Sequence, residues 1–156
     1  MKKILLIKHG SLGDIISSTS VINDIKKHFT GDQIYILTSE KFKDFFYELN
    51  CFDKIIIDNR EGISKTINII KKIFNLRVDL IIDLQNSKRT SVYAFILRIF
   101  SKIKINGTGV FSTHRYKYDK MNMPSVIDGL SNQIELLGIK TLRMPYLNWL
   151  IKEKFD

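Results

Sequence analysis

The chain has 156 residues, of which 44% are hydrophobic and 11% aromatic, a composition typical of one globular domain and unlike that of a disordered chain. Its net charge of +9 either predicts an anionic partner, such as nucleic acid, a phosphorylated glycolipid or an acidic membrane, or reflects a genome bias toward lysine. The single cysteine, Cys51, excludes an internal disulfide and favours a reducing compartment, and no apolar run has the length of a signal peptide or a membrane span.

The first stretch combines an apolar run with a sharp turn. Residues 3–8 are mostly aliphatic, two glycines follow, and apolar residues recur at helical spacing from Ile15 to about His28. This order predicts a strand that turns into a helix, the opening unit of a parallel α/β sheet. Asp14 stands at the turn, where its carboxylate can cap the helix. Because ligands bind outside the carboxyl ends of such strands, a role as a catalytic acid or base stays open.

Strands and helices alternate along the rest of the chain, and a long polar loop precedes the last helix. This alternation predicts an α/β fold with a Rossmann-like, doubly wound parallel sheet of strand order 3-2-1-4-5. Loops as long as the one expected here are commonly functional or mobile. We expect strands over 33–38, 54–57, 79–84 and 102–106, helices over 40–49, 63–74, 88–102 and 128–137, a loop over 107–125 and a tail over 144–149.

Two of the expected helices carry apolar residues at helical spacing. In the helix over 63–74 the spacing predicts a buried face. The segment 88–102 is also basic, so it is either a core helix with solvated cations, the interpretation we favour, or an amphipathic helix lying on an anionic bilayer. The apolar residues are Ile63, Ile67, Ile70, Ile73 and Phe74 in the first, and Val92, Phe95, Ile96, Ile99 and Phe100 in the second, whose cations are Lys88, Arg89, Arg98 and Lys102.

Several common sites lack their sequence signatures. No Gly-x-Gly-x-x-Gly follows the first strand, which argues against a classical dinucleotide site. His9, His28 and His114 are isolated, so no cluster at metal-ligand spacing is present. A Ser-His-Asp hydrolase is poorly supported because there is no Gly-x-Ser-x-Gly elbow.

Three motifs carry a resemblance. Residues 8–16 read Lys-His-Gly-Ser-Leu-Gly-Asp-Ile-Ile, residues 79–91 form a strand ending in Asp-Leu-Gln before a helix with Lys and Ser, and residues 104–107 read Lys-Ile-Asn-Gly. In combination they resemble the heptosyltransferase-type glycosyltransferases of glycosyltransferase family nine, which extend lipopolysaccharide cores. The similarity runs over most of residues 1–150.

The resemblance implies the N-terminal half of a GT-B glycosyltransferase, with residues 1–150 as the Rossmann-like acceptor-side domain and residues 151–156 as a tail leading to an absent C-terminal donor domain. The implied reaction is inverting transfer of a sugar such as heptose from a nucleotide-sugar such as ADP-heptose to a lipopolysaccharide-core or related glycan acceptor. The half alone is then expected to be inactive. Enzymes of this type need no metal and no cofactor besides the nucleotide-sugar. The implied place is the cytoplasm, optionally in peripheral contact with the inner face of the cytoplasmic membrane.

The resemblance also implies functional residues. Asp14 matches the family's general base, which removes the proton of the acceptor hydroxyl. Arg and Lys side chains are candidates for holding acidic or phosphate groups of the acceptor. The chain departs from the family pattern at Asn86, where Gly is usual, and at Ser125, near where members often carry His. The acceptor-binding candidates are Ser11, Gly13, Gln85, Lys88, Arg89, Arg115 and Lys117.

Two alternative functions remain, of which the first is a different class and the second keeps the fold. A basic module for nucleic acid or another anion would need cations clustered on one face with exposed aromatics, whereas most aromatics here fall on faces predicted to be buried, which makes nucleic acid the weaker candidate. A non-catalytic remnant or accessory sugar-binding subunit would keep the sheet without the chemistry.

Overall fold

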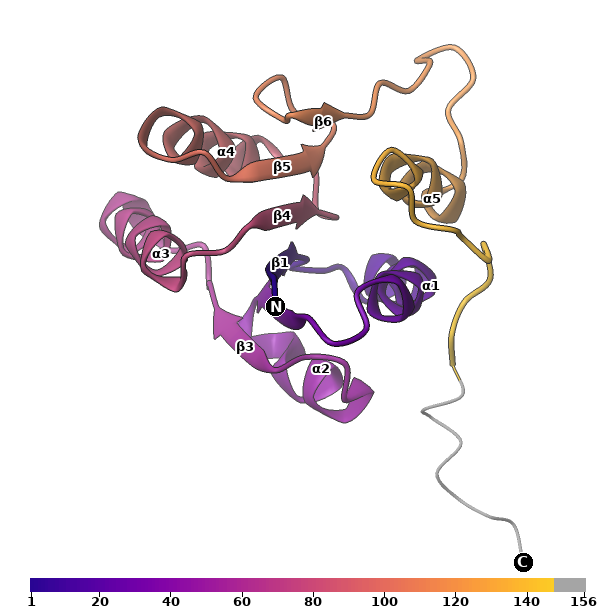
Figure 1. The fold of residues 1–156 in the computed structure, drawn as a ribbon, viewed down its shortest axis with the longest axis horizontal. Helices are drawn as coiled ribbons and strands as arrows, with labels where there is room; N and C mark the ends of the chain where they lie inside the picture. Colours follow the sequence, from indigo (N-terminus) through magenta and orange to yellow (C-terminus); the bar gives the residue numbers. More distant parts are fainter. Residues whose placement is uncertain (148–156) are drawn as a thin grey trace, which may run out of the picture.

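The protein, described over residues 1–147 in a computed structural model, is built on one parallel sheet (Figure 1). Its strand order is β3-β2-β1-β4-β5-β6. The predicted Rossmann-like order 3-2-1-4-5 is therefore confirmed, with one further strand at the β5 edge. The elements are β1 (Lys3–Ile7), α1 (Leu12–His28), β2 (Gln33–Thr38), the 3-10 helix η1 (Glu40–Phe42), α2 (Lys43–Leu49), β3 (Lys54–Ile57), α3 (Gly62–Leu76), β4 (Leu80–Asp83), α4 (Lys88–Phe100), β5 (Lys104–Gly107), β6 (His114–Arg115) and α5 (Val126–Glu135).

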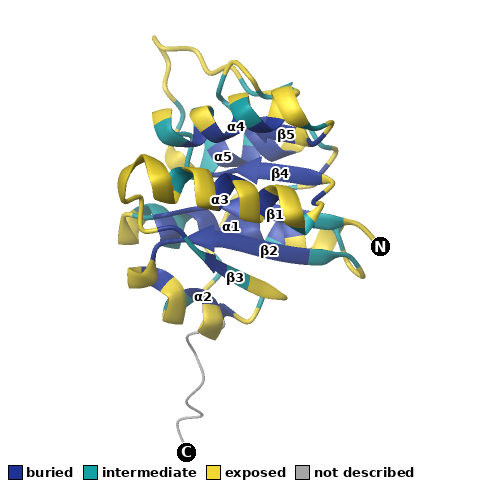
Figure 2. Ribbon diagram, turned by 90° about the vertical axis from the view of Figure 1, so that its left-hand side faces the viewer, coloured by how far each residue is buried: buried dark blue, intermediate teal, exposed yellow. Residues whose placement is uncertain are grey.

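Helices cover both faces of the sheet, which explains why the central strands are nearly all aliphatic. Apolar side chains of α1, α2 and α5 pack on one face, and those of α3 and α4 pack on the other. The strands between the two layers are the most buried part of the molecule (Figure 2). The doubly wound arrangement thus gives the chain a core on each side of a single sheet.

Helix α1 begins at Leu12, earlier than the expected start at Ile15. Ser11 is the N-cap residue, and Asp14 lies in the first turn, where its carboxylate accepts bonds from Ser11. The expectation that Asp14 sits at the turn ahead of the helix was therefore wrong, because Asp14 lies inside the helix. The reason is that apolar spacing marks only the buried residues of a helix, and its first turn is exposed here.

The observed bounds of α5 and of the loop before it also differ from the expected ones. Helix α5 begins at Val126, since the Ser125 hydroxyl accepts a hydrogen bond from the backbone N–H of Asp128. The expected loop over 107–125 contains β6, which pairs with β5 in parallel. Two residues are too few to show a strand period in the sequence. The expected tail over 144–149 and the tail over 151–156 fall wholly or partly outside the described residues.

The buried faces expected for α3 and α4 were partly wrong. In α4 the inward residues are Thr90, Tyr93, Ala94 and Leu97, whereas most of the apolar residues predicted to be buried are exposed. Both faces of α4 carry apolar side chains, so periodicity could not say which one meets the sheet. In α3, Ile70 and Ile73 are buried as expected. The predicted core residues found exposed are Ile63, Ile67, Phe74, Val92, Phe95, Ile99 and Phe100.

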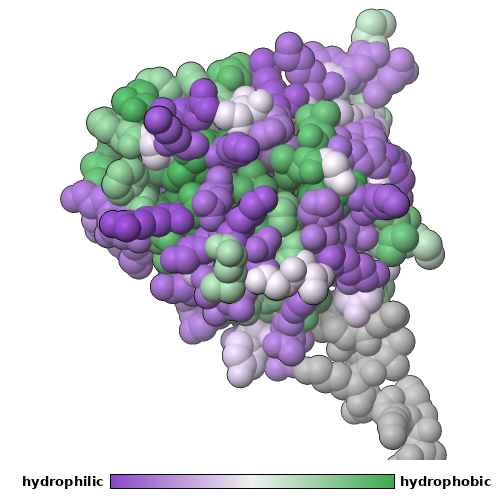
Figure 3. Space-filling view, viewed as in Figure 1, coloured by the Kyte–Doolittle hydropathy of each residue, from purple (hydrophilic) through white to green (hydrophobic). Residues whose placement is uncertain are grey.

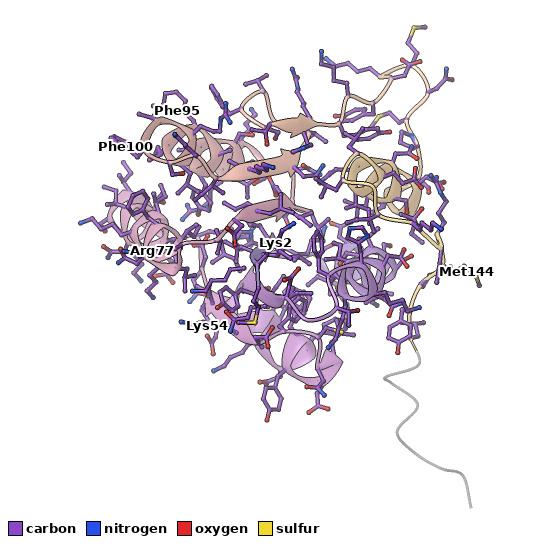
Figure 4. The ribbon with its side chains drawn as sticks, in the orientation of Figure 1. Lys2, Lys54, Arg77, Phe95, Phe100 and Met144 are labelled. Carbon is purple, nitrogen blue, oxygen red and sulfur yellow. The ribbon has the colours of Figure 1, made fainter. Side chains whose placement is uncertain are left out.

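Because all strands run in parallel, the loops that follow them meet at one edge of the sheet. Residues 8–11 follow β1, residues 58–61 follow β3, residues 84–87 follow β4 and residues 108–113 follow β5. The opposite edge, where strands begin, carries exposed cations such as Lys2, Lys54 and Arg77 (Figure 4). The carboxyl edge is the place where such sheets bind ligands.

Candidate active site at the carboxyl edge

The turn between β1 and α1 is shaped by a glycine. Gly10 has φ +120°, and a Cβ added there would lie 2.2 Å from Cε2 of Phe42. Only glycine fits such a backbone against a packed ring. Ser11 then caps α1, and Asp14 Oδ2 accepts bonds from the backbone N–H of Ser11 at 3.4 Å and from its hydroxyl at 3.2 Å. The turn therefore fixes the carboxylate of Asp14 just beyond the end of β1.

Asp14 lines a cavity of about 300 Å³ at the carboxyl edge. The β1 and β4 loops form one side of this cavity, and the segment 116–126 with α5 forms the other. The cavity presents a carboxylate, an ammonium, several amides and two phenol rings, the kinds of group that bind sugar hydroxyls. The polar and aromatic lining residues are Lys8, Asp14, Gln85, Asn86, Thr108, Tyr116, Tyr118, Ser125 and Gln133.

Lys8 places a buried cation beside Asp14. Its side chain is 4% exposed, and Nζ donates a hydrogen bond to the carbonyl oxygen of Leu84 at 3.1 Å. Burial lowers the pKa of Lys8, and the negative charges of Asp14 and Asp83 act in the opposite direction. Burial likewise raises the pKa of Asp83, although the backbone N–H groups of Gln85 and Asn86 donate to its carboxylate. Lys8, which lines the cavity, and Asp83, which does not, are therefore two buried ionisable groups of opposite sign at the ends of β1 and β4.

Asn86 and Gln133 connect the β4 loop to α5. Asn86 has φ +50°, in the left-handed region that glycine and asparagine tolerate best, which explains why Asn can replace the usual Gly at this position. Its Nδ2 donates to Oε1 of Gln133 at 2.7 Å, and its Oδ1 accepts from the backbone N–H of Thr108 at 2.9 Å. The departure from the family pattern is therefore compatible with the loop and adds two hydrogen bonds.

Gln133 is fully buried and completes an amide network beneath the cavity. Its Nε2 donates to the carbonyl oxygen of Asp83 at 2.9 Å and to Oδ1 of Asn106 at 3.1 Å. Nδ2 of Asn106 returns a bond to the carbonyl oxygen of Gln133 at 2.9 Å. Sequence reasoning missed Gln133, and the only signal for Asn106 was its place in the Lys-Ile-Asn-Gly motif. The network locks α5 to the ends of β4 and β5.

Gln85 links the two loops that frame Asp14. Its Oε1 accepts a hydrogen bond from the backbone N–H of His9 at 2.9 Å, while the residue also lines the cavity. Ser11 and Gly13 are exposed on the first turn of α1 next to Asp14. A Cβ added to Gly13 would meet no atom within 4 Å, so packing within this chain does not require glycine there.

The four predicted basic residues are not among those that line the cavity. Lys88 and Lys117 are exposed, and Nε of Arg115 donates to the carbonyl oxygen of Thr108 at 3.1 Å. Arg89 belongs to a second polar cluster, on the α3 and α4 side of the sheet, where it contacts Tyr93 and Asp58. The structure therefore brings together Asp14 and Gln85, with Ser11 and Gly13 adjoining, and leaves the four predicted basic residues outside the cavity.

The second cluster centres on Asp58, at the end of β3. Its Oδ2 lies 3.0 Å from Nε2 of His9 and accepts from the Tyr93 hydroxyl at 2.6 Å, and its Oδ1 accepts from the Arg60 backbone N–H at 2.9 Å. Burial opposes ionisation of Asp58, but these hydrogen bonds outweigh it and hold its pKa below the usual value. Burial and the bond to Asp58 raise the pKa of Tyr93 to about 12. This cluster ties β1, β3 and α4 together.

Among residues 1–147, no group of three or more His, Cys, Asp or Glu side chains is placed to hold a metal ion. Over the same residues, no helix has both the length and the apolar content needed to cross a bilayer.

The fold and the cavity define an α/β Rossmann-like unit with a polar site at the carboxyl edge. The solved structures that are similar to it in fold include glycosyltransferases. The chain is similar to a glycosyltransferase family 9 structure from Veillonella parvula, with 22% identity and a TM-score of 0.70 over 92% of this chain and 43% of that one. It is similar to Escherichia coli heptosyltransferase WaaC with ADP-2-deoxy-2-fluoro heptose, with 12% identity and a TM-score of 0.67 over 91% and 50%. It is also similar to E. coli ADP-heptose lps heptosyltransferase II, with 16% identity and a TM-score of 0.70 over 93% and 44%.

No protein-family model and no curated protein matches the chain. At the level of fold, the structural comparisons confirm the resemblance to heptosyltransferase-type glycosyltransferases, and the architecture is consistent with one Rossmann-like half of a GT-B enzyme. The chain spans half or less of the length of these three structures.

Proposed function

We propose that this chain is the acceptor side of an inverting, heptosyltransferase-like glycosyltransferase. The observation that carries the proposal is the position of Asp14, fixed by the Ser11 turn at the wall of a polar cavity in a fold shared with heptosyltransferases. The donor is a nucleotide-sugar, with ADP-heptose as the specific candidate, and the acceptor is a lipopolysaccharide-core or related glycan. Neither a metal nor a further cofactor takes part.

Asp14 acts as the general base. One carboxylate oxygen of Asp14 takes the proton of the acceptor hydroxyl. At the same time the hydroxyl oxygen of the acceptor attacks the anomeric carbon of the donor. The bond between the anomeric carbon and the nucleotide diphosphate breaks on the opposite side, so the configuration inverts and ADP leaves with the bonding electrons. Ser11 holds the carboxylate through two hydrogen bonds, so its orientation is set before the acceptor arrives.

The rest of the cavity positions the acceptor. Gln85 and Asn86 offer amide groups to sugar hydroxyls, while the rings of Tyr116 and Tyr118 offer apolar faces to the sugar ring. Arg115 and Lys117 are exposed near the segment that closes the cavity, so they suit anionic groups on a part of the acceptor that extends outside it. Lys88 would contact only such an extended part, and Arg89 is held by Asp58 and Tyr93.

The donor is held on a second Rossmann-like domain, for which residues 151–156 would be the connection. We expect the 156-residue chain on its own to bind the acceptor and to transfer nothing, because transfer requires the donor to be held in line with the acceptor hydroxyl. The proposed location is the cytoplasm, at the inner face of the cytoplasmic membrane, where a glycolipid acceptor would be available.

The proposal is tested in two steps. First, the 156-residue chain is titrated with a lipid-free lipopolysaccharide-core oligosaccharide, and its backbone amide signals are monitored by NMR. The signals of Asp14, Gln85, Asn86 and Tyr116 should shift. With a donor-binding domain supplied, ADP-heptose and the same oligosaccharide should release ADP and yield a product one heptose heavier. Binding without any transfer would favour an accessory sugar-binding subunit, and signals that do not move at the cavity would overturn the acceptor assignment.

A further inference from the structure

Helix α4 exposes an apolar stripe on the side facing away from the sheet. Val92, Phe95 and Ile99 recur at spacings of three and four residues, so they lie along one line of the helix, and Phe100 adjoins its end. Phe100 is 70% exposed. The labelled rings of Phe95 and Phe100 project from the outer side of α4 (Figure 4). A soluble helix normally places charged or polar residues on this side.

Neighbouring segments extend the stripe into a wider surface. A groove of about 390 Å³ between α3 and α4 is lined by Phe74 of α3 and by Ile96 and Phe100 of α4. On the other side of α4, the ring of Phe111 lies 4.8 Å from that of Phe95, centroid to centroid. We call this surface the α3/α4 face, and part of it is the green and white area over these helices in Figure 3. Its exposed apolar residues are Ile63, Ile67, Phe74, Val92, Phe95, Ile99, Phe100, Val110 and Phe111.

Only cations accompany these apolar residues in the sequence. Residues 62–78, which contain α3, have no Asp or Glu, and neither do residues 84–118, which contain α4 and the β5–β6 loop. Glu61, directly before α3, pairs with Lys65, and Arg77, Lys102 and Lys104 lie with Lys2 at the edge where the strands begin. The remaining cations still give the face an excess of positive charge. The cations of the two segments are Lys65, Lys71, Lys72, Arg77, Lys88, Arg89, Arg98, Lys102, Lys104, Arg115 and Lys117.

We infer that the α3/α4 face docks on an anionic phospholipid bilayer, with the apolar side chains in the headgroup and acyl boundary and the cations on the lipid phosphates. Apolar residues within a basic rim are the combination that binds such a surface. A second copy of this chain is the poorer occupant, because it would bring together two faces that each carry an excess of positive charge. Nucleic acid is also the poorer occupant, although Phe74, Phe95, Phe100 and Phe111 offer rings for stacking. The reason is that exposed aliphatic side chains, Ile63, Ile67, Val92 and Ile99, are interspersed with these rings, and they suit the acyl boundary of a bilayer better than bases.

The α3/α4 face adjoins the candidate active site. The meaning of this neighbourhood for the acceptor rests on the proposed function. Phe111 packs on Phe95, while Thr108, at the start of the same loop, lines the cavity and donates its backbone N–H to Asn86. A bilayer under the α3/α4 face would therefore lie next to the loop that borders the acceptor cavity. A lipid-anchored acceptor could then enter the cavity without leaving the membrane.

The test is cosedimentation of the 156-residue chain with phospholipid vesicles that contain no glycolipid, so its result does not depend on transfer. The protein should bind vesicles of phosphatidylcholine with 30% phosphatidylglycerol and not vesicles of phosphatidylcholine alone, and 0.5 M salt should weaken the binding. The double variant Phe95→Ser, Phe100→Ser should lower partitioning by about tenfold or more, and so should Arg98→Gln with Lys102→Gln.

Matched controls remove the same kinds of group from the other side of the sheet. Tyr47 on α2 is 73% exposed, so Tyr47→Ser removes an equally exposed ring, and Lys41→Gln with Lys43→Gln removes two exposed charges. These variants should bind vesicles as the parent does, and circular dichroism checks that every variant is folded.

Equal loss in the control and test variants would overturn the inference, because binding would then follow net charge alone. Binding to neutral vesicles as strong as to anionic ones would also overturn it. Concentration-dependent dimers abolished by Phe100→Ser would assign the face to a second copy instead. A mobility shift of RNA or DNA abolished by the Phe95 and Phe100 changes would assign it to nucleic acid. Failure of the transfer assay, with vesicle binding intact, would remove only the proposed function.

Discussion

Replacing Gln133 with leucine tests whether the buried amide network holds the cavity together. Gln133 is completely buried, and its side chain makes three hydrogen bonds, to Asp83, Asn106 and Asn86. Leucine is apolar and of similar size, so the change removes the bonds with little loss of packing. It also leaves polar atoms of the three partners without their bond to Gln133. At about 0.5–1.5 kcal/mol for each bond, the free energy of unfolding should fall by about 1.5–4.5 kcal/mol.

The assay is urea unfolding followed by circular dichroism at 222 nm. For a domain of this size, a loss of about 3 kcal/mol corresponds to a melting temperature lower by roughly 6–12 °C. The control is Asn132→Leu on the same helix, whose side chain bonds Tyr116 and Arg143 nearer the surface, and which should cost about 1 kcal/mol or less. If Gln133→Leu costs no more than the control, the network contributes no specific stability and the reasoning fails.

Two further predictions concern Asp58 and Gly13. The pKa of Asp58 in the folded chain lies below the ordinary aspartate value of 3.8, so its ionised form stabilises the fold above about pH 4, and that stability is lost as the pH falls through the folded pKa. Asp58→Asn should therefore cost about 2–3 kcal/mol at pH 7 by chemical unfolding and progressively less below about pH 4, and a cost independent of pH would contradict this. Gly13→Ala should raise stability by about 0.5 kcal/mol, because alanine favours helix and meets no atom here, while lowering transfer by about tenfold if the acceptor approaches this turn. Transfer equal to that of the parent would remove Gly13 from the acceptor site.

The order of the elements was predictable because it depends on local patterns. Aliphatic runs alternate with segments of helical period, and this alternation, with the right-handed crossover rule, leaves few possible sheets. The place of Asp14 at the carboxyl edge followed from the same logic, because the loop after β1 leads into the first turn of α1, whereas Gln85 was indicated only by the family resemblance. Parallel strands bring such residues to one edge whatever the detailed packing.

The amide network and the outer face of α4 were not predictable. Gln133 meets Asn106 and Asn86 across 27 and 47 residues of sequence, and nothing local marks these side chains as partners. In α4, apolar residues occupy both sides of the helix. The helical spacing therefore indicates a helix but does not indicate which of its sides faces the sheet. Tyr93, whose hydroxyl bonds Asp58, and Leu97 face the sheet, while Phe95 and Ile99 face outward.

Asp14→Asn most directly tests the central claim that Asp14 is the base of a glycosyl transfer. Asparagine keeps the shape and caps helices about as well as aspartate, so the melting temperature should change little. With the donor-binding domain supplied, the rate of heptose transfer should fall by about two to four orders of magnitude. The control is Asp32→Asn at the opposite edge, where the carboxylate likewise accepts a backbone N–H, that of Lys2 at 2.7 Å, and transfer should persist. Near-parental transfer by Asp14→Asn would contradict the account and leave Asp14 as part of the helix cap alone.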